Sequence, residues 1–160
     1  MNATAWQRSS RHQKTRFAAI SGSMRRAVSA SGSGTVRIKL LLIGGSVNPE
    51  VGASLGGRAM REVARIRPDL LVLGVCSIHA KEGLGAFDAE DAEMKRTLIQ
   101  RAGSVAVAVL NEKLESVAAH RVLEIDSIAD VVVEADAPAD AMMALAERGL
   151  RIHQTAPRTH

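Results

Sequence analysis

Apolar residues along this chain gather in short runs, and the segments between the runs carry apolar residues at helical spacing. Five runs predict strands: Ile38–Ile43, Leu70–Val75, Val105–Leu110, Val131–Glu134 and Leu150–His153. The runs are nearly continuous rather than alternating, which is typical of parallel strands covered on both faces. Each is far shorter than the roughly 20 apolar residues of a membrane span, so we expect no transmembrane helix.

Three segments between the runs predict helices: Leu55–Arg67, Asp88–Arg101 and Ala139–Arg148. Asp88 is a suitable N-cap for the second helix, and Gly103 follows its end. Val117–Glu124 is predicted as one helical turn or a loop. Strands that alternate with helices predict an α/β fold with three layers, in which helices cover a Rossmann-like, mostly parallel sheet.

The basic character of the chain is confined to its N-terminal segment. Residues 1–39 contain eight Lys or Arg and no Asp or Glu, whereas the remaining 121 residues carry 13 basic and 17 acidic side chains. The folded part is therefore mildly acidic overall, which argues against nucleic-acid binding by that part. A single cysteine, Cys76, rules out an internal disulfide and suits the cytoplasm. It also gives no basis for a metal site, and we expect no cofactor.

The first 35 residues are predicted to be a basic, disordered and dispensable tail, because they lack a steady apolar period and end in a Ser/Gly-rich stretch. A short amphipathic helix around Phe17–Val28 is an alternative for part of this tail. Two functional interpretations also stay open: an arm that touches nucleic acid or an acidic partner, and an organelle transit peptide. Residues 36–155 then form the domain, and residues 156–160 form a disordered C-terminus.

Several residues follow predicted strands and are candidates for ligand binding. Parallel strands present their carboxyl ends at one edge of a sheet. We therefore expect Gly44–Val47, Ser77–Gly85 and Asn111–Lys113 to lie together at that edge. Lys95, near the start of the second helix, approaches the same edge. The candidate ligand-binding residues are Gly44, Gly45, Gly74, Ser77, Gly83, Lys95 and Lys113.

Each candidate also has a purely structural interpretation. Lys95 pairs equally well with Asp91 on an exposed helix face, and Lys113 suits a solvated loop. The Gly44–Gly45 turn needs glycine whenever its backbone adopts positive φ. His79 is able to bond a sugar hydroxyl but is as readily explained as a solvated loop residue. The sequence contains no Ser-His-Asp set and no paired-carboxylate site, so we expect no catalytic residue.

One ordered set of residues resembles the effector-sensing domain of DeoR-family transcriptional regulators. Its members are Asp69, Gly74, Gly83, Leu84, Asp91, Lys95, Arg96 and Lys113. The resemblance covers about Val36–Thr155. It implies a Rossmann-like sheet related to sugar-phosphate isomerases, a phosphorylated sugar or similar metabolite as ligand, and control of a winged helix-turn-helix.

The chain differs from that family pattern in three places. We expect no winged helix-turn-helix before the domain, and the Asp-x-Gly-Thr-Thr-like phosphate turn is missing. Leu110 also stands where the last strand of the family usually ends in an acidic residue. The chain is therefore expected to be a truncated sensor domain of a repressor, cytoplasmic and self-associating, that reaches DNA only through a helix-turn-helix outside it. The alternatives are an isomerase-like enzyme and a remnant without ligand.

Overall fold

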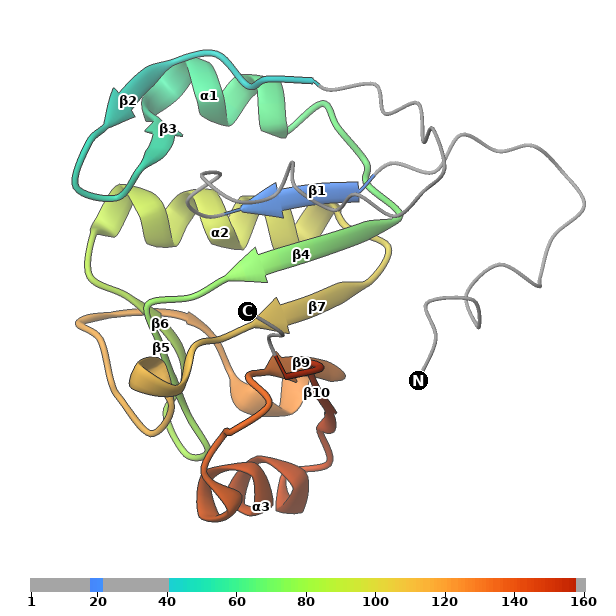
Figure 1. Cartoon of the computed structure of the whole chain (residues 1–160). Coiled ribbons are helices and arrows are strands. Elements are labelled where there is room, and N and C mark those ends of the chain that lie inside the picture. The colour runs from blue at the N-terminus through green and yellow to red at the C-terminus, as the bar shows by residue number, and fades with distance from the viewer. Residues whose placement is uncertain (1–17, 22–40, 158–160) are drawn as a thin grey trace, which may run out of the picture.

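A five-stranded parallel sheet forms the centre of the molecule (Figure 1). The computed structural model describes residues 18–21 and 41–157. The strand order is β1-β4-β7-β9-β10, and every neighbouring pair is parallel. The strands are β1 (Ala18–Ser21), β4 (Leu70–Gly74), β7 (Val105–Ala108), β9 (Asp130–Val133) and β10 (Arg151–Gln154). The predicted α/β fold with a parallel sheet is confirmed.

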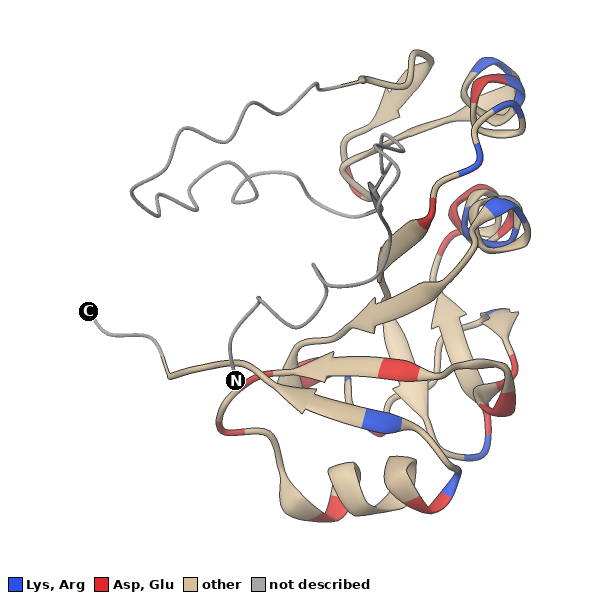
Figure 2. Cartoon of the chain, turned by 90° about the vertical axis from the view of Figure 1, so that its right-hand side faces the viewer, with Lys and Arg blue, Asp and Glu red and all other residues tan. Residues whose placement is uncertain are grey.

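Three helices flank the sheet, in the places that the apolar spacing predicts. They are α1 (Gly56–Val63), α2 (Ala89–Arg101) and α3 (Ala139–Glu147). The helices α1 and α2 lie on the same side of the sheet, and α3 lies next to β9 and β10 (Figure 2). Asp88 is the N-cap of α2, as predicted, and its side chain accepts a hydrogen bond from the Asp91 N–H at 2.8 Å. No helix in the described part of the chain is long and apolar enough to cross a bilayer.

The core is aliphatic, as expected for a chain with three aromatic residues. Leu71, Leu73, Val107 and Val131 of the parallel sheet are completely buried. A second cluster joins α1 to α2 through four buried side chains: Leu55, Ala59, Val63 and Met94. These contacts fix α1 against α2, while Ala92 of α2 belongs to the core cluster of the sheet.

Two small antiparallel sheets add elements that local sequence patterns did not predict. One is the hairpin of β2 (Ser46–Asn48) and β3 (Ala53–Leu55). The other has the order β5-β6-β8, with β5 (Ser77–His79), β6 (Gly83–Ala86) and β8 (His120–Leu123). The prediction of a helical turn or loop over Val117–Glu124 is wrong for residues 120–123. Their partner is β6, which lies more than 30 residues away and leaves no trace in the local pattern.

The first strand corrects the prediction that residues 1–35 are all tail. Ala18–Ser21 pairs with Leu70–Leu73 of β4 and forms one edge of the parallel sheet. The alternative of an amphipathic helix around Phe17–Val28 is therefore wrong for residues 18–21, and the rest of that segment lies outside the described residues. A four-residue strand is too short to produce a period of its own. Its pairing with β4 is what specifies it.

The predicted strand Ile38–Ile43 is also corrected where the structure describes it. Leu41–Ile43 form no strand, and Leu41 and Leu42 are exposed. Among the described strands none lies beyond β1 to pair with them. Residues 38–40 lie outside the described part of the chain.

Gly83 is required by the packing of β6, which gives a first testable prediction. Its φ is +79°, and a Cβ there would lie 3.1 Å from Glu124 Cα and closer still to the Leu123 carbonyl oxygen. We expect Gly83→Ala to destabilise the protein by about 2–3 kcal/mol, from backbone strain together with displacement of β8. Urea unfolding measures this change.

Gly149→Ala is the matched control. Gly149 also has positive φ, +87°, but a Cβ at this position would have no atom within 4 Å. The substitution should cost only about 1 kcal/mol of conformational strain. Equal costs for the two substitutions would mean that the contact with β8 does not matter.

Candidate functional site

The carboxyl ends of the parallel strands meet at one edge of the sheet, where the segments that follow them carry polar side chains. Cys76 follows β4, and the short helix η3 (Asn111–Lys113) follows β7. Glu134 and Asp136 follow β9, and Thr155 follows β10. In open α/β sheets this edge is where ligands bind, since loops from several strands converge there.

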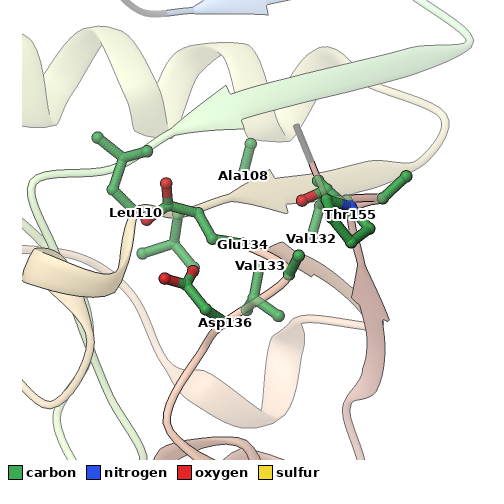
Figure 3. Close-up of a pocket in the computed structure, with 11 residues that line it drawn as sticks. Ala108, Leu110, Val132, Val133, Glu134, Asp136 and Thr155 are labelled. Carbon is green, nitrogen blue, oxygen red and sulfur yellow. The ribbon is translucent and has the colours of Figure 1, made fainter. Parts of the chain in front are cut away.

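A cavity of about 660 Å³ lies at this edge, between the ends of β7, β9 and β10. Figure 3 shows Leu110, Glu134 and Asp136 on one side of it and Thr155 across from them. Ala108, Val132 and Val133 supply apolar surface. An apolar cavity with a few convergent polar groups is the usual form of a small-molecule site.

Asn111 holds both carboxylates of the cavity in place. Its backbone N–H donates to Glu134 Oε2 at 2.8 Å, and its side-chain Nδ2 donates to Asp136 Oδ1 at 3.0 Å. Its Oδ1 is buried and, among the described residues, has no hydrogen-bond partner. Two carboxylates are therefore held at the cavity, and such a pair favours ligands that bring hydroxyl or ammonium donors.

A buried ion pair lies beneath the turn that leaves β4. The Lys95 ammonium bonds the Asp91 carboxylate, and both side chains are about 5% exposed or less. Cys76 Sγ lies 3.8 Å from Lys95 Nζ and 4.0 Å from Asp91 Oδ2. The pairing of Asp91 with Lys95 is the one that helix spacing predicts, but the pair is buried rather than on an exposed face. Its ammonium is engaged within the chain.

Lys113 is the accessible cation of the predicted set. It ends η3, one residue beyond Glu112, whose Oε1 lies 3.0 Å from its Nζ. The side chain is one-third exposed. Since Asn111 of the same turn holds the two carboxylates of the cavity, Lys113 belongs to the same corner of the sheet edge.

The predicted Gly44–Val47 segment does not follow a parallel strand. It leads into the β2-β3 hairpin, and the Gly44 N–H donates to Glu62 Oε2 of α1 at 2.8 Å. That hydrogen bond lowers the pKa of Glu62. Gly45, with φ of +138°, lies so close to α1 that a Cβ would contact Ala59. These glycines fasten the chain to α1, and the Gly44 N–H is already used.

The remaining predicted residues lie in or next to the β5-β6-β8 sheet. Gly74 ends β4 and pairs with Ala108. Ser77 is 1% exposed and lies directly against Gly85, where a Cβ would overlap its hydroxyl. His79 Nδ1 accepts hydrogen bonds from the backbone N–H groups of residues 81 and 82, so it caps the β5-β6 turn. No group of three His, Cys, Asp or Glu in the described ranges is arranged to hold a metal ion.

Sequence reasoning misses the acidic side of the cavity. The apolar pattern identifies Glu134 only as the end of a strand, and it gives no role to Asp136 or Thr155. A signal is present, because Glu134 ends a predicted strand, and Asp136 and Thr155 follow predicted strands as Lys113 does. A phosphorylated ligand favours cationic partners, and for that reason the acidic residues are not among the predicted site residues.

An open parallel sheet with a cavity at its carboxyl edge defines a small-ligand-binding α/β domain. Comparison with protein families gives the particular class: residues 11–135 match the DeoR C-terminal sensor domain, and the chain belongs to that family. The family is regulatory and not catalytic, in agreement with the expectation that this chain is not an enzyme. The match also begins before β1, which agrees with a place for that strand in the domain.

A curated relative gives a more distant comparison. The chain is 23% identical over 115 residues to a protein of Escherichia coli O157:H7 named "Putative aga operon transcriptional repressor". The aligned part is 72% of this chain and 43% of that protein. The chain therefore spans less than half the length of the relative it matches.

Proposed function

We propose that this chain senses a phosphorylated sugar or a related metabolite and thereby controls transcription. The observation that carries the proposal is the cavity at the carboxyl ends of β7, β9 and β10 in a domain of the DeoR sensor family. A sensor domain acts by binding an effector better in one conformation than in another. The name of the bacterial relative supports transcription as the process that is controlled.

The chemistry of the cavity supports a ligand rich in hydroxyl groups. Glu134 and Asp136 accept hydrogen bonds, and their charges repel a phosphate placed between them. The hydroxyl-bearing side of the effector therefore faces these carboxylates. Its phosphate points away from them, toward Lys113 and the turn after β4 that begins at Gly74.

Lys95 has a different part in this proposal from Lys113. Its ammonium is bonded to Asp91, so it contributes to the site by holding the turn after β4 and α2 together. Lys113 is partly exposed and makes the direct contact with the phosphate. Ser77 and Gly83 support the same turn through the β5-β6-β8 sheet. Gly44 and Gly45 instead hold the chain before β2 against α1.

The regulatory part of the proposal extends beyond this domain. Effector binding shifts the conformation of the domain, and the shift reaches DNA through a helix-turn-helix segment of the full regulator. We propose that the domain works in the cytoplasm and associates with further copies of itself.

Lys113→Ala tests the contact with the phosphate. We expect it to weaken binding of the phosphorylated sugar about tenfold to a hundredfold, which corresponds to the roughly 1–3 kcal/mol of a charge-assisted hydrogen bond. Isothermal titration calorimetry measures the affinity. Lys81→Ala is the control, because Lys81 is an exposed lysine in the β5-β6 turn. If both substitutions left the affinity unchanged, Lys113 would not be part of the site.

A further inference from the structure

Five arginine side chains form an exposed basic surface at α1. Arg58 and Arg61 belong to α1, Arg65 and Arg67 follow its end, and Arg101 is the last residue of α2. Arg101 joins the group because its guanidinium donates to the Ala64 carbonyl oxygen, with Nε at 2.8 Å. Figure 2 shows basic residues along α1 and the chain after it. We refer to these five residues as the arginine face.

The helix presents this face because its opposite side is buried. Ala59 and Val63 pack into the core, which leaves Arg58 and Arg61 on the outer side. The carboxylate within the face is Glu62, and it is held by the Gly44 N–H and by Arg58 Nε at 3.2 Å. Glu62 lies within the face and Asp69 follows Arg67 by two positions, so the five arginines outnumber the nearby carboxylates and the face is positive.

The net charge of the domain does not show that its basic and acidic side chains are concentrated in different parts of it. Residues 41–67 hold four Lys or Arg and two Asp or Glu, whereas residues 68–157 hold eight Lys or Arg and 15 Asp or Glu. The mildly acidic net charge of the folded part is an average over the whole domain and does not describe the surface at α1. The basic side chains at its α1 end are exposed together, and most of the acidic ones lie elsewhere.

We propose that the arginine face binds the phosphate backbone of double-stranded DNA without reading its sequence. Arg58 and Arg61 are three positions apart on α1, a spacing that places Cβ atoms about 5–6 Å from one another and suits neighbouring phosphates along a strand. Guanidinium groups bind phosphate through paired hydrogen bonds. Contacts of this kind position a protein on DNA and carry no base specificity.

A second copy of the chain fits the arginine face less well. Several of its acidic side chains are already bonded within the chain, among them Asp126 by Arg148 and Asp130 by Arg151. The arginine bond also lowers the pKa of Asp130. Glu134 accepts the Asn111 N–H. DNA offers a denser row of unpaired negative charge, about one per 1.7 Å of duplex.

The test compares two double substitutions in the full chain. Arg61→Gln with Arg65→Gln removes two charges from the arginine face. Lys81→Gln with Arg148→Gln removes two exposed charges elsewhere and is the matched control. Fluorescence anisotropy gives the affinity of each protein for two duplexes of unrelated sequence, from about 50 to 200 mM salt.

The arginine-face variant should bind both duplexes at least about tenfold more weakly at low salt. Its plot of log affinity against log salt should be less steep by about 1–2, since each lost phosphate contact removes about 0.9. The control should keep the wild-type slope. The proposal is overturned if the wild type does not bind duplex DNA at low salt, or if both variants give the same slope. Loss of self-association in sedimentation, with DNA binding unchanged, would assign the face to a second copy instead.

Discussion

Replacing Lys95 by alanine is expected to lower the free energy of unfolding by about 3–5 kcal/mol, because it leaves the Asp91 carboxylate buried without its partner. Both side chains lie under the turn after β4 and have almost no contact with solvent. For a protein of this size the loss corresponds to a fall of about 10 °C in the unfolding temperature. Thermal and urea unfolding followed by circular dichroism measure both quantities.

Two further variants show whether the loss of stability comes from the unpaired charge of Asp91 or from the lost packing of the Lys95 side chain. Asp91→Leu with Lys95→Met removes both charges and keeps the volume, so it should retain most of the stability. Lys113→Ala breaks the partly exposed pair with Glu112 and should cost less than about 1 kcal/mol. A Lys95→Ala protein as stable as Lys113→Ala would show that the ion pair is not buried in solution.

Removal of residues 1–34 is expected to destabilise the domain by several kcal/mol and to make it aggregate. The truncation deletes β1 and exposes the edge of β4 along Leu70–Leu73. Each lost backbone hydrogen bond costs about 0.5–1.5 kcal/mol, and an uncovered edge strand pairs readily with other chains. Unfolding experiments and light scattering measure the two effects.

The matched truncation removes residues 1–10, which precede both β1 and the family match. It should leave the unfolding transition unchanged. If removal of residues 1–34 were equally harmless, the expectation of a dispensable tail would stand and β1 would contribute nothing to stability.

The elements that sequence reasoning predicts well are those with a strong local signal. The helix α2 has an N-cap at Asp88 and acidic residues in its first turn, and β4 is a continuous apolar run. By contrast, β1 and β8 are short, and each is specified by a distant partner, β4 and β6 respectively. The sequence pattern places the glycines of β6 in a loop, whereas Gly83 and Gly85 are there because neighbouring atoms leave no room for a Cβ.

The candidate site shows the same division. The sheet edge that carries Lys113 follows from strand order, and the spacing of Asp91 and Lys95 predicts their pairing. The burial of that pair could not be predicted, because it depends on the turn at Cys76 and on how α2 packs against distant segments. The cavity at Glu134 likewise depends on a loop held by Asn111, which lies 23 positions away.

Thermal unfolding of the full chain in the presence of sugars is the most direct test of effector sensing. Each phosphorylated sugar of a panel is compared with the same sugar without phosphate. A ligand that binds only the folded protein stabilises it by about 2.7 kcal/mol at a hundred times its dissociation constant. The account predicts that at least one phosphorylated sugar raises the unfolding temperature by about 5–10 °C, while its unphosphorylated parent does not. It is contradicted if no phosphorylated sugar raises that temperature, or if the parent sugar raises it equally.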